Sequence, residues 1–365
     1  MKKLLIIVGT RPNFIKITQF KRVAGKKYPG TFDIKVLHTG QHYDNNMANV
    51  FFEQFELFPD YFLNIRPASP NTQMAEVMLG LEKVMNNFDP DLLIVVGDVN
   101  STFAAALTAN KMNIKIAHIE SGLRSFDRGM PEEINRILTD ELADYLFITE
   151  KSGIDNLLRE GKRKSQLSFV GNTMIDTMIA FSDKIDASCV MENMALEKGK
   201  YVLMTMHRPA TVDHIKGLKK LTDLINHISN QYKIVFPIHP RTVNKLKQYS
   251  LYEEFQNIKG LILTDPMDYF SFQKLIANCR LILTDSGGIQ EESTFRQVPC
   301  LTLRPNTERP STIELGTNIL VPFSNTEIKR HIINIDKGVF KNGNIPPKWD
   351  GKSTERILKI LAHEK

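Results

Sequence analysis

Short apolar runs rich in β-branched residues alternate with amphipathic helical stretches along the whole chain. This alternation is typical of parallel sheets covered by helices, so the sequence predicts an α/β fold. The expected strands form two series, residues 4–8, 34–38, 92–96, 114–119, 145–148 and 167–170, followed by 202–206, 234–238, 261–263, 281–283 and 300–303. Helical periodicity is clearest over residues 72–84, 132–143 and 215–228.

The two series of strands indicate two domains. The length of 365 residues supports this interpretation, since one domain commonly takes about 150 residues. Residues 183–200, between the series, are rich in Ser, Asp, Glu and Lys and show no strand pattern. We therefore expect an N-terminal domain over residues 1–170 and a C-terminal domain over residues 171–351. We expect a final helix over residues 352–365 to pack back on the first domain.

Composition narrows the class of protein. Hydrophobic residues make up 42% and charged residues 24%, as in ordinary globular proteins. No apolar run approaches the roughly 18 residues of a membrane span, and the short run 4–8 after Met-Lys-Lys does not resemble a secretory signal. The formal charge is +6, but only residues 162–164 form a compact basic run. Nucleic-acid binding is therefore disfavoured, whereas small anions such as nucleotides suit the positive excess.

The three cysteines, Cys189, Cys279 and Cys300, lie far apart and have no CxxC spacing. This spacing argues against a zinc site or a disulfide framework and suits a reducing cytoplasm. We interpret all three as buried or inert thiols.

The first expected strand leads into the stretch Gly9-Thr10-Arg11-Pro12-Asn13-Phe14-Ile15-Lys16. A helix that begins here would bring backbone N–H groups together with the cations of Arg11 and Lys16, which is the chemistry of an anion site. Neither GxGxxG nor GxxxxGKS/T occurs here or elsewhere, so we expect neither a nicotinamide cofactor nor a P-loop. The alternative is an ordinary strand-to-helix turn with Arg11 and Lys16 on the surface.

Three carboxylates of the first domain stand where a ligand would bind. Asp98 and Glu120 each come directly after an expected strand, and Glu132 follows Pro131 at the start of an expected helix. Ligands of open parallel sheets bind outside the carboxyl ends of the strands, so we interpret the three as candidates for proton transfer. Each also has an ordinary structural explanation, because Asp98 could cap the next helix and Glu132 could favour a helix start.

One segment of the second domain indicates nucleotide binding. Ser286-Gly287-Gly288 separates a strand from a helix and leaves N–H groups for a diphosphate, while Glu292 could accept two hydrogen bonds from a ribose diol. No HExxH or other paired spacing of ligands occurs, so we expect no metal. Further binding candidates in this domain are the polar residues that follow strands or stand near this turn in the sequence, namely His207, His239, Arg241 and Arg309.

Taken together, the ordered motifs resemble those of the non-hydrolysing UDP-N-acetylglucosamine 2-epimerases, over about residues 3–322. The motifs are residues 9–12, 39–43, 97–98, 118–124, 131–133, 171–176, 207–209, 285–292 and 307–310. The resemblance implies two facing Rossmann-like domains with parallel sheets, the GT-B type of architecture, with UDP in the cleft between them. It also implies a UDP-amino sugar as substrate, no cofactor, a homodimer, and a place in the synthesis of cell-surface polysaccharide precursors.

The resemblance also implies roles for individual residues. Proton-transfer or elimination roles come to Asp98, Glu120 and Glu132. Substrate or phosphate contacts come to Arg11, Lys16 and His207, of which Lys16 and His207 are counted with the catalytic residues. Nucleotide contacts come to Ser286, Gly287, Gly288 and Glu292.

An elimination mechanism fits these roles, because the C2 hydrogen of an amino sugar has no adjacent carbonyl to acidify it. UDP leaves C1 as the C2 proton departs, which gives 2-acetamidoglucal. UDP then adds back at C1 while C2 is protonated on its opposite face. This chemistry needs an acid or base on each face of the sugar and cations beside the departing phosphate.

Some positions depart from the family pattern. Asn13-Phe14 stands where many members have Glu-Ala, Ser121 stands where many have Ala, and the segment between Arg124 and Pro131 is shorter. These features indicate a subgroup, so a modified UDP-amino sugar is an open alternative, as are a GT-B glycosyltransferase and a sensor that binds a nucleotide sugar without turnover. Gln41 and His42 resemble part of a second UDP-sugar site that activates some bacterial members, and activation stays open.

Overall fold

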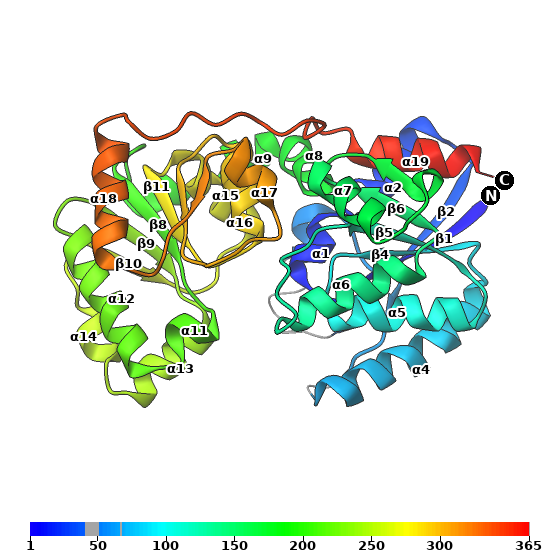
Figure 1. The fold of residues 1–365 in the computed structure, drawn as a ribbon, viewed down its shortest axis with the longest axis horizontal. Coiled ribbons are helices and arrows are strands. Elements are labelled where there is room, and N and C mark those ends of the chain that lie inside the picture. The colour runs from blue at the N-terminus through cyan, green and yellow to red at the C-terminus, as the bar shows by residue number, and fades with distance from the viewer. Residues whose placement is uncertain (41–50, 66–67, 365) are drawn as a thin grey trace. The chain divides into compact units, whose positions relative to one another are not determined.

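The structure, a computed structural model, describes residues 1–40, 51–65 and 68–364. Its backbone forms two compact units (Figure 1). Unit 1 comprises Met1–Ala180 and Pro347–Lys365, and unit 2 comprises Phe181–Pro346. The chain leaves unit 1 at Ala180 rather than at residue 170, because helix α8 (Thr173–Ala180) packs within unit 1. There, Thr177 Oγ1 donates a hydrogen bond of 2.5 Å to the carbonyl of Ile15.

Unit 1 is built on a parallel sheet, whose strand order in the described residues is β3-β2-β1-β4-β5-β6-β7. The strands are β1 (Lys2–Val8), β2 (Phe32–His38), β3 (Tyr61–Phe62), β4 (Leu92–Val96), β5 (Lys115–Ser121), β6 (Tyr145–Ile148) and β7 (Leu167–Phe169). The helices include α1 (Arg11–Ile15), α2 (Phe20–Lys27), α4 (Pro70–Phe88), α5 (Asn100–Lys111), α6 (Pro131–Leu142), α7 (Lys151–Arg159), α8 and α19 (Ser353–His363). All six strands expected for this half are present, and β3 is an additional short edge strand.

Local sequence explains these elements. β4 consists of five apolar residues that are all buried, as expected for a central strand covered on both faces. In α4, Leu81, Met85 and Phe88 recur at helical spacing and belong to the same buried cluster as residues of β1 and β4. Ser69 begins this helix, because its side chain accepts a hydrogen bond from the N–H of Thr72 at 3.3 Å.

Unit 2 is built in the same way, with the strand order β10-β9-β8-β11-β12-β13 in the described residues. The strands are β8 (Tyr201–Thr205), β9 (Lys233–Pro237), β10 (Leu261–Thr264), β11 (Leu281–Thr284), β12 (Cys300–Thr302) and β13 (Asn318–Leu320). The helices include α9 (Ser182–Asp186), α10 (Val190–Asn193), α11 (Pro209–Val212), α12 (Ile215–Ile228), α13 (Pro240–Gln248), α14 (Tyr252–Gln256), α15 (Tyr269–Asn278), α16 (Gly288–Phe295), α17 (Pro310–Glu314) and α18 (Asn325–Asp336). The polar stretch 183–200 thus holds two short helices.

Each sheet has one place where the order of the strands reverses. In unit 1 the first strand, β1, lies between β2 and β4, and in unit 2 the first strand, β8, lies between β9 and β11. Ligands of such sheets bind beyond the carboxyl ends of the strands at this point. The turns after β1, β4, β8 and β11 are therefore the places where the candidate residues must be sought.

The C-terminal helix α19 lies against α2 and α8 of unit 1 (Figure 1). Asp176 of α8 holds its first turn, since the carboxylate accepts hydrogen bonds from the N–H groups of Ser353 at 3.0 Å and Thr354 at 2.6 Å. Just before the helix, Trp349 is buried and donates from Nε1 to the carbonyl of Thr149 at 3.1 Å. Both ends of the chain lie at the same end of unit 1, where Lys2 Nζ is 3.3 Å from the carbonyl oxygen of Leu361.

Two other expectations can be compared with the structure. In the described part of the chain, no helix combines the length and the apolar character that crossing a membrane requires. Cys279 and Cys300 are buried, and burial raises the pKa of Cys300 to about 11. Cys189 is exposed, so two of the three cysteines are buried as expected, and the inertness of Cys189 stays a prediction.

Candidate functional site

The turn after β1 places two cations in different surroundings. Thr10 precedes α1, and Pro12 stands in its first turn, where a missing N–H does no harm. The guanidinium of Arg11 lies over the ring of Phe51, with Cζ 4.8 Å from the ring centroid. Lys16 is buried and forms an ion pair with Glu120. The alternative of a surface lysine is therefore wrong for Lys16.

Glu120, at the end of β5, has a strained backbone. Its φ is +69°, a conformation that non-glycine residues rarely adopt, and the pairing of β5 with β6 shifts register between Ile119 and Ser121. The carboxylate comes close to the turn after β4, because a Cβ at Gly97 would lie 3.4 Å from Glu120 Oε2. Glu120 Oε2 therefore lies beside the backbone of Gly97, whose φ of +68° is a conformation that favours glycine.

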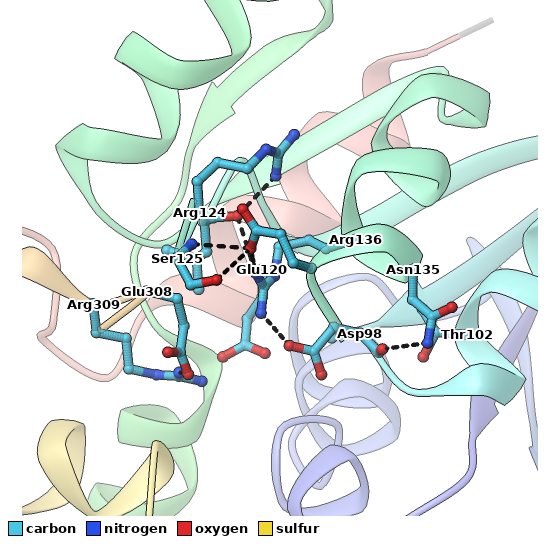
Figure 2. Close-up of polar contacts among 12 residues, drawn as sticks. Asp98, Thr102, Glu120, Arg124, Ser125, Asn135, Arg136, Glu308 and Arg309 are labelled. Carbon is cyan, nitrogen blue, oxygen red and sulfur yellow. Dashed lines mark hydrogen bonds and ion pairs between the residues drawn. The ribbon is translucent and has the colours of Figure 1, made fainter. Parts of the chain in front are cut away.

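Asp98 is held from α6 (Figure 2). Its carboxylate forms an ion pair with Arg136, and its backbone carbonyl accepts a hydrogen bond from Asn135 Nδ2 at 3.0 Å. The side chain of Arg136 is buried, whereas that of Asp98 is 25% exposed. The residue at the cap position of α5 is Val99, so Asp98 does not have the capping role considered as its alternative.

Glu132 and Glu133 are neighbours with opposite surroundings. Glu132 is exposed in the first turn of α6, whereas Glu133 is buried. Glu133 accepts hydrogen bonds from Ser125 N at 2.9 Å, Ser125 Oγ at 3.0 Å and Phe126 N at 3.0 Å. It also pairs with Arg136 at 2.8 Å. The exposed Glu132 has a side chain available to a ligand, while Glu133 fixes the loop after β5.

In unit 2, the turn after β11 orients His207. Asp285 is fully buried and accepts hydrogen bonds from the N–H groups of His207 at 2.9 Å and Arg208 at 2.8 Å. Its other oxygen lies 2.9 Å from His207 Nδ1. Burial raises the pKa of Asp285, but the contacts with His207 and Arg208 outweigh burial and hold it below its ordinary value. The carboxylate thus turns the ring of His207 so that Nε2 points away from it.

The stretch Ser286-Gly287-Gly288 opens α16 as expected, with Gly287 at the cap position and Glu292 buried on the helix. A Cβ at Gly287 would meet Glu308 Oε1 at 2.8 Å and Arg309 Nη1 at 3.0 Å, so a side chain there would require these paired groups to shift. Arg309 is buried and paired with Glu308 and Glu291.

Arg304 is a buried cation that the sequence reasoning did not single out. It pairs with Glu308 at 3.1 Å. Burial, first of all, and the neighbouring charges of Arg208 and Arg309 lower its pKa. Arg208, Arg304 and Arg309 are therefore near enough for their charges to interact, and Arg309 lies beside Gly287.

In the turn after β9, the side chains of both candidate residues contact other groups of unit 2. His239 begins α13, and its Nδ1 accepts a hydrogen bond from the N–H of Arg241 at 3.1 Å. Arg241 is partly exposed and forms a two-pronged ion pair with Asp213 at 2.6 and 2.8 Å. The ring centroids of His239 and His207 are 5.5 Å apart. His239 thus lies beside His207, whereas the guanidinium of Arg241 is paired with Asp213.

The structure brings together Lys16, Asp98 and Glu120 in unit 1, and His207, His239 and the turn 286–288 with Glu292 and Arg309 in unit 2. Gln41 and His42 lie outside the described residues. No group of three or more His, Cys, Asp or Glu side chains within residues 1–40, 51–65 and 68–364 is arranged to hold a metal ion. Sequence reasoning gave no role to Glu133, which appeared only within the motif 131–133, or to Arg136, whose only signal was its three-residue spacing from Glu133 on α6.

Comparison with known proteins adds to this geometry. A model of the UDP-N-acetylglucosamine 2-epimerase family matches residues 26–362. A UDP-N-acetylglucosamine 2-epimerase of Methanocaldococcus jannaschii is 41% identical over 371 aligned residues, which cover 100% of both chains. A UDP-2,3-diacetamido-2,3-dideoxy-D-glucuronate 2-epimerase of Pseudomonas aeruginosa is 35% identical over 365 aligned residues, 99% of each chain.

Solved structures agree with these matches. The crystal structure of Methanocaldococcus jannaschii UDP-GlcNAc 2-epimerase in complex with UDP-GlcNAc and UDP has a TM-score of 0.90 at 40% identity, covering 99% of this chain and 100% of that one. A sucrose-phosphate synthase from Thermosynechococcus elongatus has a TM-score of 0.59 at 11% identity, covering 99% of this chain and 96% of that one, and shares the fold alone. The expected α/β fold of two Rossmann-like domains with parallel sheets, of GT-B type, is confirmed.

Proposed function

Because the chain belongs to the UDP-N-acetylglucosamine 2-epimerase family and is an isomerase, we propose that it interconverts UDP-N-acetylglucosamine and UDP-N-acetylmannosamine. The resemblance found in the sequence is confirmed by the match over residues 26–362. The observation that best supports the reaction is the pair of adjacent turns carrying Asp98 and Glu120, each with its carboxylate beside a buried cation. The exposed Glu132 supplies a third titratable group in the same unit.

These carboxylates suit an elimination at C1 and C2 of the sugar. One carboxylate accepts the C2 proton while the bond between C1 and the UDP oxygen breaks, which gives 2-acetamidoglucal and UDP. A second carboxylic acid then protonates C2 on the opposite face as UDP adds back at C1. Lys16 holds Glu120 and Arg136 holds Asp98, so neither carboxylate has to be ordered during the reaction.

Unit 2 suits the binding of UDP. The N–H groups of the turn 286–288 and the start of α16 would hold the diphosphate, and Glu292 would accept hydrogen bonds from the ribose hydroxyls. His207, oriented by Asp285, and Arg309 beside Gly287 would stabilise the negative charge on departing UDP. For Arg11, at the start of α1 in unit 1, the family resemblance supports a contact with the substrate or its phosphate.

Proton NMR of UDP-N-acetylglucosamine in deuterium oxide, with the purified protein and no acceptor, tests this proposal. We expect the manno isomer to appear with deuterium at C2, because a carboxylic acid that reprotonates C2 exchanges with solvent. Free UDP and 2-acetamidoglucal should accumulate slowly on long incubation. Isomer that keeps its original C2 hydrogen, with no glycal detected, would contradict the elimination mechanism. A sugar that stays unchanged except for slow hydrolysis would favour a glycosyltransferase.

A second candidate substrate is a modified UDP-amino sugar. It is supported by the relative from Pseudomonas aeruginosa and by the positions at which this chain departs from the common family pattern, such as Asn13 and Ser121. Measuring kcat/KM for UDP-N-acetylglucosamine and for UDP-2,3-diacetamido-2,3-dideoxy-D-glucuronate side by side decides between the two. A higher value for the diacetamido sugar would replace the first assignment.

The same proposal extends to the cell. We propose that the enzyme acts in the cytoplasm as a homodimer and supplies amino-sugar precursors of cell-surface polysaccharides. The scattered cysteines support the reducing compartment, and the family resemblance supports the dimer. Sedimentation velocity of the purified protein at several concentrations would reveal the oligomeric state, and a monomer throughout would contradict the dimer.

A further inference from the structure

His118 is a buried side chain that no step above uses. It belongs to β5, two residues before Glu120, and has no exposed surface. Its Nδ1 lies 2.6 Å from Asp140 Oδ1, and its Nε2 lies 2.8 Å from the carbonyl oxygen of Gly97. The ring thus joins α6 to the turn that carries Asp98.

Both partners of the ring are hydrogen-bond acceptors. A backbone carbonyl can only accept, and a carboxylate can only accept as well. Asp140 is such a carboxylate, because its other oxygen accepts a hydrogen bond from Gly122 N at 3.0 Å and lies 2.7 Å from Arg124 Nη1. Burial alone would raise the pKa of Asp140, but His118 and Arg124 more than offset it and hold the pKa below its ordinary value. Two acceptors at these distances require that both ring nitrogens of His118 carry a proton.

The charges around the ring balance, although one of the carboxylates, Glu160, is exposed. Asp140 faces His118 from α6, and Arg124 faces Asp140 from the loop after β5. Arg124 also pairs with Glu160 at 2.6 Å, so each cation has an anionic partner. Glu120, two residues after His118 on β5, pairs with Lys16. An imidazolium at His118 is therefore compensated in place and does not need solvent.

The carbonyl that His118 binds belongs to the residue before Asp98. Gly97 has a left-handed backbone, and its N–H donates to the carbonyl of Ile119 at 3.1 Å. Asn135 holds the carbonyl of Asp98, and Arg136 holds its carboxylate. Within the described residues, the ring of His118 is the one side chain that contacts the carbonyl of Gly97. Without His118, this contact would be lost.

We propose that His118 is a positioning residue, held as an imidazolium, that fixes the turn of Gly97 and Asp98 for proton transfer. The proposal rests on the proposed function, since it assigns Asp98 to the reacting carbon. His118 would act through Asp98 and would not touch the substrate. This role explains why a histidine without exposed surface lies close to the reacting groups. Small displacements of a reacting group are costly, and about 1 Å can lower a rate by roughly 10²-fold.

Two variants test the proposal. His118→Ala removes both contacts, and His118→Gln keeps an amide N–H that can reach the carbonyl of Gly97. Asp176→Asn is the matched control, because it removes another buried carboxylate of unit 1 that accepts two backbone N–H groups. We expect kcat to fall by about 10²-fold in His118→Ala with KM unchanged, to recover in part in His118→Gln, and to stay normal in Asp176→Asn.

Two measurements do not depend on turnover and so separate this proposal from the proposed function. ¹⁵N NMR of histidine-labelled protein should show one histidine with both ring nitrogens protonated, and this signal should be absent from His118→Gln. Amide hydrogen exchange at residues 97–99 should be faster in His118→Ala than in wild type or Asp176→Asn. A single ring proton on His118, unchanged exchange at 97–99, or equal kcat in His118→Ala and Asp176→Asn would each overturn the proposal.

Discussion

Replacing Glu132 and Glu133 by Gln, one at a time, should give opposite results. The two residues are adjacent in the sequence and begin the same helix, so the substitutions match in chemistry and in position. Glu132→Gln removes an exposed titratable group, whereas Glu133→Gln alters a buried acceptor of four hydrogen bonds. The first should affect the reaction and the second should affect stability.

The magnitude for Glu133 follows from its contacts. Three donors converge on Oε2, and Phe126 N donates to Oε1. The amide oxygen of Gln can keep the three contacts, but its NH₂ group would face the N–H of Phe126, and a buried donor left unsatisfied costs about 1–3 kcal/mol. The charged pair with Arg136 is also lost, although Arg136 keeps Asp98, so we expect a total of about 3 kcal/mol.

Thermal unfolding and initial rates measure both effects. For a unit of about 200 residues, each kcal/mol lowers the Tm by roughly 2–4 °C, so the Tm of Glu133→Gln should fall by about 6–12 °C. Glu132→Gln should keep the wild-type Tm and its affinity for UDP while losing about 10²–10⁴-fold in rate. A wild-type Tm in Glu133→Gln would refute the role given to its contacts. Full activity in Glu132→Gln would remove Glu132 from proton transfer.

Three other outcomes are expected. Glu292→Ala should weaken UDP binding by ~1.5–3 kcal/mol in titration calorimetry, because hydrogen bonds to a charged group are lost, and unchanged affinity would end its ribose role. Turnover should need neither NAD nor a divalent metal, since the sequence has no dinucleotide fingerprint and no metal-ligand spacing, and activity lost in EDTA and restored by a metal would contradict this. The pKa of Asp285 lies below its ordinary 3.8, so its contribution to stability is complete above that value and is lost as the pH falls through the folded-state pKa. The difference in unfolding free energy between wild type and Asp285→Asn should therefore be constant well above the ordinary pKa of 3.8 and narrow as the pH falls below it, and a difference independent of pH would speak against the contact with His207.

Much of the fold could be predicted because its strands are short apolar runs buried on both faces. β4 and β6 begin and end at the residues expected from their hydrophobic pattern. β3 and β13 were missed because their two and three residues show no clear apolar pattern, whereas β7, another three-residue edge strand, continues to the buried Val170. Their positions depend on the neighbouring strand and not on their own sequence.

The candidate site was predictable only where its residues follow strands. Asp98 and Glu120 stand at strand ends, so topology alone places them at the ligand side of the sheet. Lys16 and Glu120 are 104 positions apart in the sequence, and a single sequence cannot show that two such distant residues form an ion pair. Glu133, Arg136 and Asp140 were given no role because they line one face of α6. In the sequence, such a face looks like the ordinary charged surface of a helix.

The order in which the chain is synthesised has a consequence for unit 1. Its last helix, α19, is encoded after the whole of unit 2, yet Ile357, Leu358 and Leu361 are buried against unit 1. During translation, unit 2 can therefore complete its core before α19 is available to pack on α2 and α8. A nascent chain stalled before residue 353 would hold a folded unit 2 together with a unit 1 that still lacks its last helix and that chaperones could recognise.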